Sequence, residues 1–124
     1  VGLGRWAAGL GTAAFLGASI LSEPLFAGMV GSSAGYVPSL LAMLGIGGYL
    51  VATRHRAGPA VLAAGAVFAV SLGLRMADAP LCAGWPLGTH FLWHVLNAVT
   101  LGLLLAAAVA GRQPETEAAR ASAR

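Results

Sequence analysis

The stretch DAPLCAGWPLGTHFLWHVLN, residues 78–97, carries most of the chemically distinctive side chains of this chain. It holds two of the three histidines, the single cysteine, two of the three tryptophans and one of the four acidic residues. His90 and His94 lie four residues apart in a run of helical character, which places both imidazoles on one face about one turn apart. This spacing suits the chelation of a single zinc ion, and it also suits two histidines that only stabilise a helix bundle.

The composition around this stretch is that of a membrane protein. Of the 124 residues, 58% are hydrophobic and 9% are charged, and the mean hydropathy is +0.82. A soluble domain carries about 25% charged residues, so lipid is the expected solvent of this chain. The net charge of +3 comes from seven arginines and no lysine. No basic patch with interleaved aromatic residues is present, which excludes a nucleic-acid partner.

Four apolar runs predict an all-α fold, a polytopic membrane helix bundle with four spanning helices. The runs cover about residues 6–22, 36–53, 59–76 and 89–110, and a spanning helix needs about 20 residues. Residues 1–111 therefore form the predicted transmembrane helical region. The first run is followed by Glu23 and Pro24 and then by a Gly/Ser-rich connector at 28–35. Helical ends that extend into the flanking residues would lengthen the first three runs. The tail, residues 112–124, is polar, and Pro114 predicts a break after the last helix.

The arginines predict an orientation in the membrane. Arg5, Arg112 and the loop at 54–56 fall on one side of a four-span topology, and the positive-inside rule makes that side cytoplasmic. The C-terminus is then cytoplasmic as well. Asp78 and Cys82 fall on the opposite side, where disulfides form.

Small residues predict where helices pack closely. Gly45, Gly47 and Gly48 cluster in the second apolar run, and Gly65 and Ala69 form a small-xxx-small step in the third. Such positions allow close helix approach in lipid.

The start of the fourth run is predicted to bring polar side chains together. Thr89 is a plausible N-cap, and Asn97 shares the helical face of His90 and His94, where its amide is placed to orient a ligand or a substrate. Polar side chains in a lipid-embedded helix normally face a partner or a cavity. Three interpretations stay open for the histidines: hydrogen bonds to neighbouring helices, haem ligation and zinc ligation. Haem is disfavoured because two axial ligands do not come from one helix four residues apart.

Zinc ligation by this motif requires further groups. Residues 91–93 supply no glutamate of the HExxH kind, so a hydrolase needs its carboxylate and a third ligand elsewhere. His55 is a poor third ligand, because it lies in a loop on the opposite side of the predicted membrane.

The order DxxxC at 78–82 followed by GTHFLWHxxN at 88–97 resembles the last helix of alkaline ceramidases and their bacterial relatives. These belong to a wider group of seven-helix membrane hydrolases that includes the adiponectin/progestin receptors. The resemblance implies that the four helices are the last four of a seven-helix fold in a bacterial inner membrane. It also implies a zinc-dependent hydrolase of linear amide C–N bonds, which cleaves ceramide-like lipid amides to a sphingoid base and a fatty acid.

The resemblance assigns roles to individual residues. His90 and His94 match the zinc ligands, Trp93 matches a packing aromatic, and Cys82 matches one half of a disulfide to the N-terminal region. Asp78 matches an aspartate of the family. Two roles stay open for it: a structural pairing with Arg75, and a place at the zinc site.

The third histidine and the serine of the family have no counterpart here, because no Ser-x-x-x-His occurs in the chain. The chain also starts at Val1 without a methionine. We therefore expect a C-terminal part that lacks its N-terminal helices and is inactive alone. The alternative is a non-catalytic, receptor-like or scaffolding membrane protein with a structural histidine pair.

Overall fold

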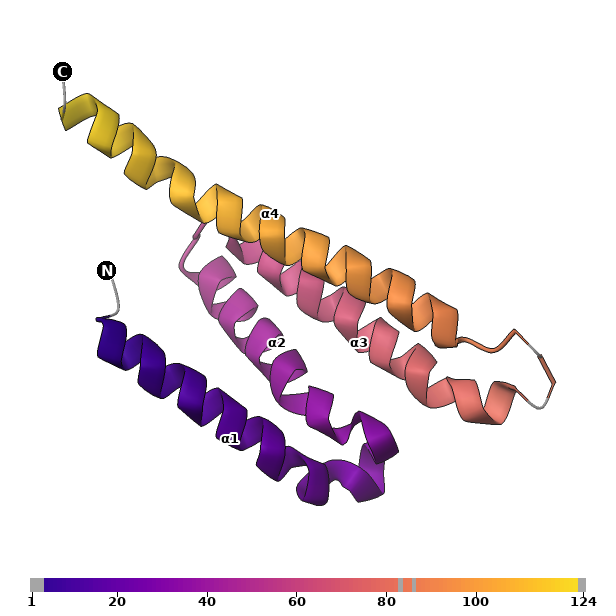
Figure 1. Ribbon diagram of the computed structural model, residues 1–124. Coiled ribbons are helices and arrows are strands. Elements are labelled where there is room, and N and C mark those ends of the chain that lie inside the picture. Colours follow the sequence, from indigo (N-terminus) through magenta and orange to yellow (C-terminus); the bar gives the residue numbers. More distant parts are fainter. Residues whose placement is uncertain (1–3, 83, 86, 123–124) are drawn as a thin grey trace. The chain divides into compact units, whose positions relative to one another are not determined.

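The computed structural model describes residues 4–82, 84–85 and 87–122, with side chains up to Gly111. Its helices are α1 (Arg5–Val30), the 3-10 helix η1 (Gly31–Tyr36), α2 (Val37–Ala52), α3 (Gly58–Leu81) and α4 (His90–Ser122) (Figure 1). The prediction of an all-α fold is confirmed for the described residues, which contain no strand. The chain forms two compact units, Val1–Leu40 and Leu41–Arg124.

The first unit consists mainly of α1 and η1. The hydroxyl of Ser22 is buried and donates to the carbonyl oxygens of Ser19 (2.8 Å) and Ala34 (3.1 Å). The second of these bonds ties the helix to the 3-10 turn. Gly31, with φ +54°, makes the turn between them in a conformation that other residues rarely adopt.

The first helix is longer than the predicted span of residues 6–22. α1 continues through Pro24 to Val30, and the expected Gly/Ser connector is largely the helical turn η1. A proline removes one backbone donor, and such breaks are tolerated in apolar helices where the freed groups find other partners. In α1 the helix-forming context therefore outweighs the missing backbone donor of Pro24.

In the second unit, α2 and α3 approach through glycines. A Cβ atom added at Gly47 would lie 2.7 Å from the backbone nitrogen of Leu62, and one at Gly65 would lie 2.9 Å from Leu44 Cδ2. Gly45 and Gly48 have open space instead. The small residues of this unit therefore pack closely at two of the predicted positions.

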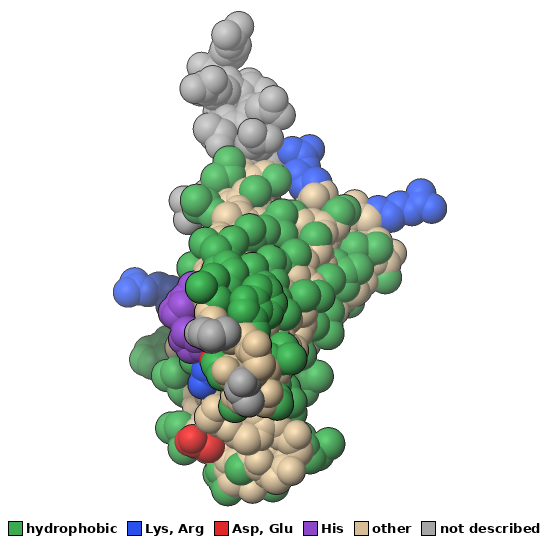
Figure 2. All heavy atoms as spheres, turned by 90° about the vertical axis from the view of Figure 1, so that its right-hand side faces the viewer, with side chains coloured by type: hydrophobic (Ala, Val, Ile, Leu, Met, Phe, Trp, Pro, Cys, Tyr) green, Lys and Arg blue, Asp and Glu red, His purple; other side chains and the backbone are tan. Residues whose placement is uncertain are grey.

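α3 and α4 lie side by side along most of α3 (Figure 1). The buried apolar side chains of this unit are small in number, and they include Ala64, Phe68 and Leu72 from α3 and Ala107 from α4. Large apolar side chains face outward in many places, and hydrophobic side chains cover much of the face in Figure 2. This is the distribution expected when lipid rather than water surrounds the helices.

Three helical stretches within the described residues are long and apolar enough to cross a membrane: Arg5–Ala52, Gly58–Leu81 and His90–Gly111. The first of them is one continuous stretch that includes α1, η1 and α2. α2 alone has 16 residues, below the typical length of a spanning helix. The prediction of four spanning helices is therefore not confirmed.

The C-terminal segment also differs from the prediction. α4 does not end near Gly111 but continues through Pro114 to Ser122, beyond the start of α3 (Figure 1). Alanine, glutamate, glutamine and arginine dominate this segment and favour helix, which outweighs the single missing donor of Pro114.

The glycine contact between α2 and α3 gives a test of the packing. Gly47→Ala should lower the free energy of unfolding by about 1–3 kcal/mol, because its Cβ meets backbone rather than a side chain that can move. Gly48→Ala, at a position with open space, should be neutral or slightly stabilising. Loss of helical circular dichroism during titration of the detergent-solubilised chain with dodecyl sulfate measures both. Equal stability of the two variants would contradict the close approach.

Candidate functional site

The polar residues of the 78–97 stretch gather at the corner between α3 and α4. Gly88, with φ +61°, brings the connecting loop back against the end of α3. A Cβ atom added there would lie 2.5 Å from Asp78 Oδ1 and 2.9 Å from Cys82 Sγ. Both the backbone conformation and the lack of space therefore require glycine at this position.

Asp78 holds the start of α4 from the neighbouring helix. Its Oδ1 accepts hydrogen bonds from the backbone N–H groups of Thr89 (2.6 Å) and His90 (2.9 Å). A carboxylate at this place satisfies donors that lack partners inside the helix and complements the positive end of the helix dipole.

The predicted capping role of the Thr89 side chain was wrong. The hydroxyl of Thr89 donates to the carbonyl oxygen of Leu74 on α3, at 2.6 Å. Thr89 precedes the first helical residue as predicted, and its carbonyl accepts from the N–H of Leu92 at 3.1 Å. The side chain of this residue therefore joins two helices, and the capping oxygen comes from Asp78.

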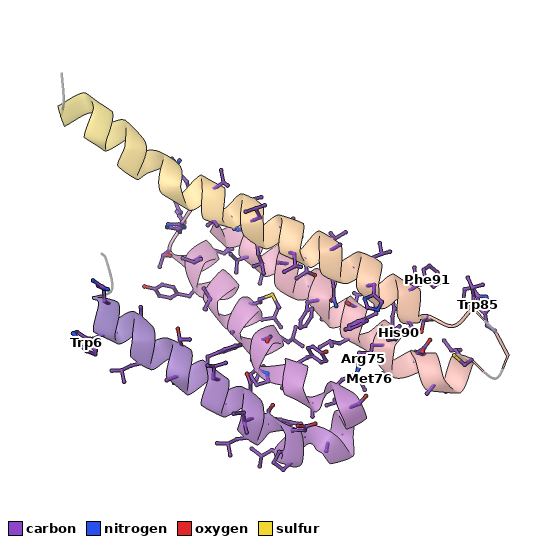
Figure 3. The ribbon with its side chains drawn as sticks, viewed as in Figure 1. Trp6, Arg75, Met76, Trp85, His90 and Phe91 are labelled. Carbon is purple, nitrogen blue, oxygen red and sulfur yellow. The ribbon has the colours of Figure 1, made fainter. Side chains whose placement is uncertain are left out.

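His90 and His94 form an exposed pair on adjacent turns of α4. Their ring centroids lie 4.9 Å apart, with an angle of 80° between the ring planes. The predicted placement on one face, one turn apart, is confirmed. Figure 2 shows histidine side chains together at the surface, next to hydrophobic ones, and Figure 3 shows His90 at the start of α4.

The exposure of the pair follows from helix geometry. Each residue turns the helix by about 100°, so Thr89, Thr100 and Ala107 lie within about 20° of one another, and all three are buried. His90 and His94 lie about 100° and 140° round from Thr89. The contact with α3 therefore leaves the histidines on the flank of the helix pair.

Trp93 lies between the histidines and α3. Its ring centroid is 4.4 Å from that of His94 and 5.1 Å from that of His90. The guanidinium carbon of Arg75 on α3 lies 5.0 Å from the Trp93 ring centroid, within the range of a cation–π interaction. Figure 3 shows Arg75 on α3 close to the start of α4. The predicted pairing of Arg75 with Asp78 stays a prediction.

Asn97 bonds to a residue that the sequence did not single out. Ser71 is fully buried. Its hydroxyl has two acceptors on α4, Asn97 Oδ1 at 3.0 Å and the carbonyl oxygen of Trp93 at 3.2 Å. The amide oxygen of Asn97 is therefore engaged with α3, and its role next to a ligand stays a prediction. The only signal for Ser71 was a lone hydroxyl in an apolar run.

The donor set for a metal is partial. No group of three or more histidine, cysteine, aspartate or glutamate side chains that could hold a metal ion occurs among residues 4–82, 84–85 and 87–111. Neither Asp78 nor Cys82 joins the histidine pair in such a group. His90 and His94 supply two imidazole nitrogen donors, a ligand type that zinc binds, whereas a zinc site has three or four protein ligands.

Two further predicted residues lie away from the pair. Cys82 is exposed at the end of α3, with its thiol 3.7 Å from Asp78 Oδ1, and its disulfide stays a prediction. Partial desolvation and the carboxylate of Asp78 raise the pKa of the Cys82 thiol above its ordinary value. His55 lies exposed in the α2–α3 connector, where its Nδ1 accepts from the N–H of Ala57, so its prediction as a loop histidine is confirmed.

Comparisons with protein-family models, curated proteins and solved structures find no match to this chain. The support for a function is therefore the geometry of the α3–α4 corner and the sequence motif of residues 78–97.

The buried bond between the helices gives a second test. Ser71→Ala should lower the free energy of unfolding by about 0.6–1.7 kcal/mol, the range of polar contacts between apolar helices in a bilayer. Thr100→Val is the matched control, because the Thr100 hydroxyl bonds only to Leu96 of its own helix. The free energies of unfolding of the two variants are compared by titration with dodecyl sulfate. A larger loss in Thr100→Val than in Ser71→Ala would contradict the interhelical bond.

The raised pKa of Cys82 gives a third test. At pH 8 the thiol should react with iodoacetamide more slowly than an ordinary cysteine, because less of it is thiolate. Asp78→Asn removes the nearby negative charge, so it should lower this pKa and raise the rate at pH 8 severalfold. The rates of the two proteins should converge at pH values well above both pKa values, where both thiols are ionised. Identical pH profiles would show that the carboxylate does not act on the thiol.

Proposed function

We propose that this chain forms the C-terminal helices of a membrane-embedded, zinc-dependent amide hydrolase of ceramidase type. The proposed substrates are ceramide-like lipid amides, cleaved to a sphingoid base and a fatty acid. The observation that carries the proposal is the exposed pair His90 and His94, one helical turn apart on a helix whose start is fixed by Asp78. The DxxxC and HxxxH elements of the sequence support the same assignment.

The residues present fit zinc as part of a ligand set. The two imidazoles are neighbours on one helix flank, and their exposure leaves them accessible to a ligand from another segment. We place the third ligand, a histidine, together with a serine and the proton-transferring carboxylate, on helices outside these 124 residues. A zinc ion held by His90, His94 and that third ligand would supply polarisation of a substrate carbonyl and a water whose pKa is lowered toward about 7.

The other residues of the corner support the histidines. Trp93 packs against both imidazole rings and limits their rotation. The outward-facing apolar side chains of α3 and α4 offer a surface for the acyl chains of a lipid substrate. Asn97 lies near the same flank, at about 80° from Thr89, and is the nearest amide to a bound ligand.

The proposed topology places the site at the non-cytoplasmic end of α3. Arg54 and Arg56 lie in the connector before α3, and Asp78 and Cys82 lie at its other end. With the positive-inside rule, this puts the C-terminus in the cytoplasm of a bacterial inner-membrane protein. Four spans here are the last four of seven in the proposed protein.

The second candidate is a non-catalytic, receptor-like or scaffolding membrane protein with a structural histidine pair. The lack of a third ligand among the described residues favours it. In that case the imidazoles hydrogen-bond to a neighbouring helix and hold no metal.

Zinc uptake distinguishes the two candidates. His90→Ala and His94→Ala should each lower zinc affinity by at least roughly tenfold, because losing even a hydrogen-bond partner of a ligand costs about 10- to 100-fold. His55→Ala, an exposed histidine in the α2–α3 connector, is the matched control and should bind like the unmodified chain. Zinc is measured by mass spectrometry after equilibrium dialysis of the chain in detergent micelles. Equal zinc in all four proteins would exclude the zinc assignment.

A further inference from the structure

We infer that Asp78 is the positioning residue for His90. Its carboxylate reaches across from α3, fixes the residue at which α4 begins, and so keeps His90 one turn from His94. The inference rests on the proposed function, in which the two histidines share one metal ion.

His90 is the residue of the pair that needs external support. It is the first residue of α4, and its backbone N–H has no acceptor inside its own helix. Helix ends fray for this reason. His94 lies one turn further in, where the backbone hydrogen bonds of the helix hold it. A change at the helix start therefore moves His90 and leaves His94 in place.

The local sequence does not supply this support. Thr89 stands where a side-chain cap is expected, but its hydroxyl donates to Leu74 on α3. Asp78 Oδ1 takes the capping place with two short bonds, to the N–H groups of Thr89 and His90. The support for the first turn thus comes from Asp78, which lies 11 positions before Thr89 and 12 positions before His90 in the sequence.

The loop is shaped around this carboxylate. Gly88 lies directly against Asp78 Oδ1, and the thiol of Cys82 donates to the same oxygen at 3.7 Å. A side chain at position 88 would displace the carboxylate from the N–H groups. Removing the carboxylate and displacing it should therefore have the same effect on His90.

The rest of the contact between α3 and α4 does not depend on Asp78. Ser71 bonds to α4 near Trp93 and Asn97, about two turns from Asp78 along α3. With Asp78 lost, α4 should stay against α3 while its first turn opens. This separates the positioning of His90 from the general stability of the helix pair.

Cobalt binding tests the inference with a spectroscopic signature. The 124-residue chain in detergent micelles is titrated with Co²⁺, whose visible absorption depends on the number and symmetry of its ligands. Asp78→Ala should weaken Co²⁺ affinity by about 10- to 100-fold, as for other residues that orient a metal ligand. Gly88→Ala should do the same. Asp78→Asn keeps an oxygen at the capping position, since asparagine is a good cap, and should bind nearly as the unmodified chain does.

Ser71→Ala is the control for packing. It weakens the α3–α4 contact away from the helix start, and it should leave Co²⁺ affinity and spectrum nearly unchanged. Amide hydrogen exchange gives a readout without metal: Asp78→Ala should speed exchange at His90 but not at Val99, more than two turns into α4.

The outcomes separate the two proposals. Loss of Co²⁺ binding in Asp78→Asn equal to that in Asp78→Ala would overturn the positioning role, because charge or direct ligation would then matter. An equal loss in Ser71→Ala would overturn it as well. If the unmodified chain takes up neither zinc nor Co²⁺, the proposed function fails. Exchange at His90 then still decides the positioning role, and an unchanged rate in Asp78→Ala would overturn it.

Discussion

The carboxylate of Asp78 on the backbone of α4 is the contact on which the corner of this protein depends. The first backbone N–H groups of a helix have no acceptor inside that helix, and where water is excluded each unsatisfied N–H costs several kcal/mol. Asp78 supplies an acceptor for two successive N–H groups. Gly88 leaves room for this oxygen because it has no Cβ atom. The hydroxyl of Thr89 bonds to Leu74 of α3, so the capping oxygen comes from Asp78.

Polar contacts also set how α4 is rotated against α3. Asp78, near the end of α3, bonds to Thr89 and His90, and Leu74 bonds to Thr89, the residue before α4. Ser71, earlier in α3, bonds to Trp93 and Asn97, further along α4. This is the order of contacts in an antiparallel pair. Each contact lies about one turn from the next on α3. Together they turn Thr89 and Thr100 inward and leave the histidines on the flank, so the exposure of the pair follows from contacts made by other residues.

The sequence predicted features that depend on regular helix geometry and on composition. The helices follow from the apolar runs, and the spacing of His90 and His94 follows from the 3.6-residue repeat. The continuation of α1 through Pro24 and of α4 through Pro114 was missed because the effect of a proline was judged locally, where the helical context is stronger. The capping bond of Asp78 was missed because it joins residues 11 and 12 apart through a loop whose path no local pattern specifies. Ser71 was missed because a single hydroxyl carries no periodicity.

A cap taken from a neighbouring helix behaves differently from a cap taken from the preceding residue. Had Thr89 capped α4 with its own hydroxyl, the first turn would be held wherever α4 went. With Asp78 as the acceptor, the first turn is held only while the end of α3 stays in place. The bond from Thr89 to Leu74 fixes that relation from the other direction, because it ties the residue before α4 to the last turns of α3. The position of His90 is therefore a property of the helix pair, and any ligand or partner that shifts the end of α3 acts on the histidine pair through this corner.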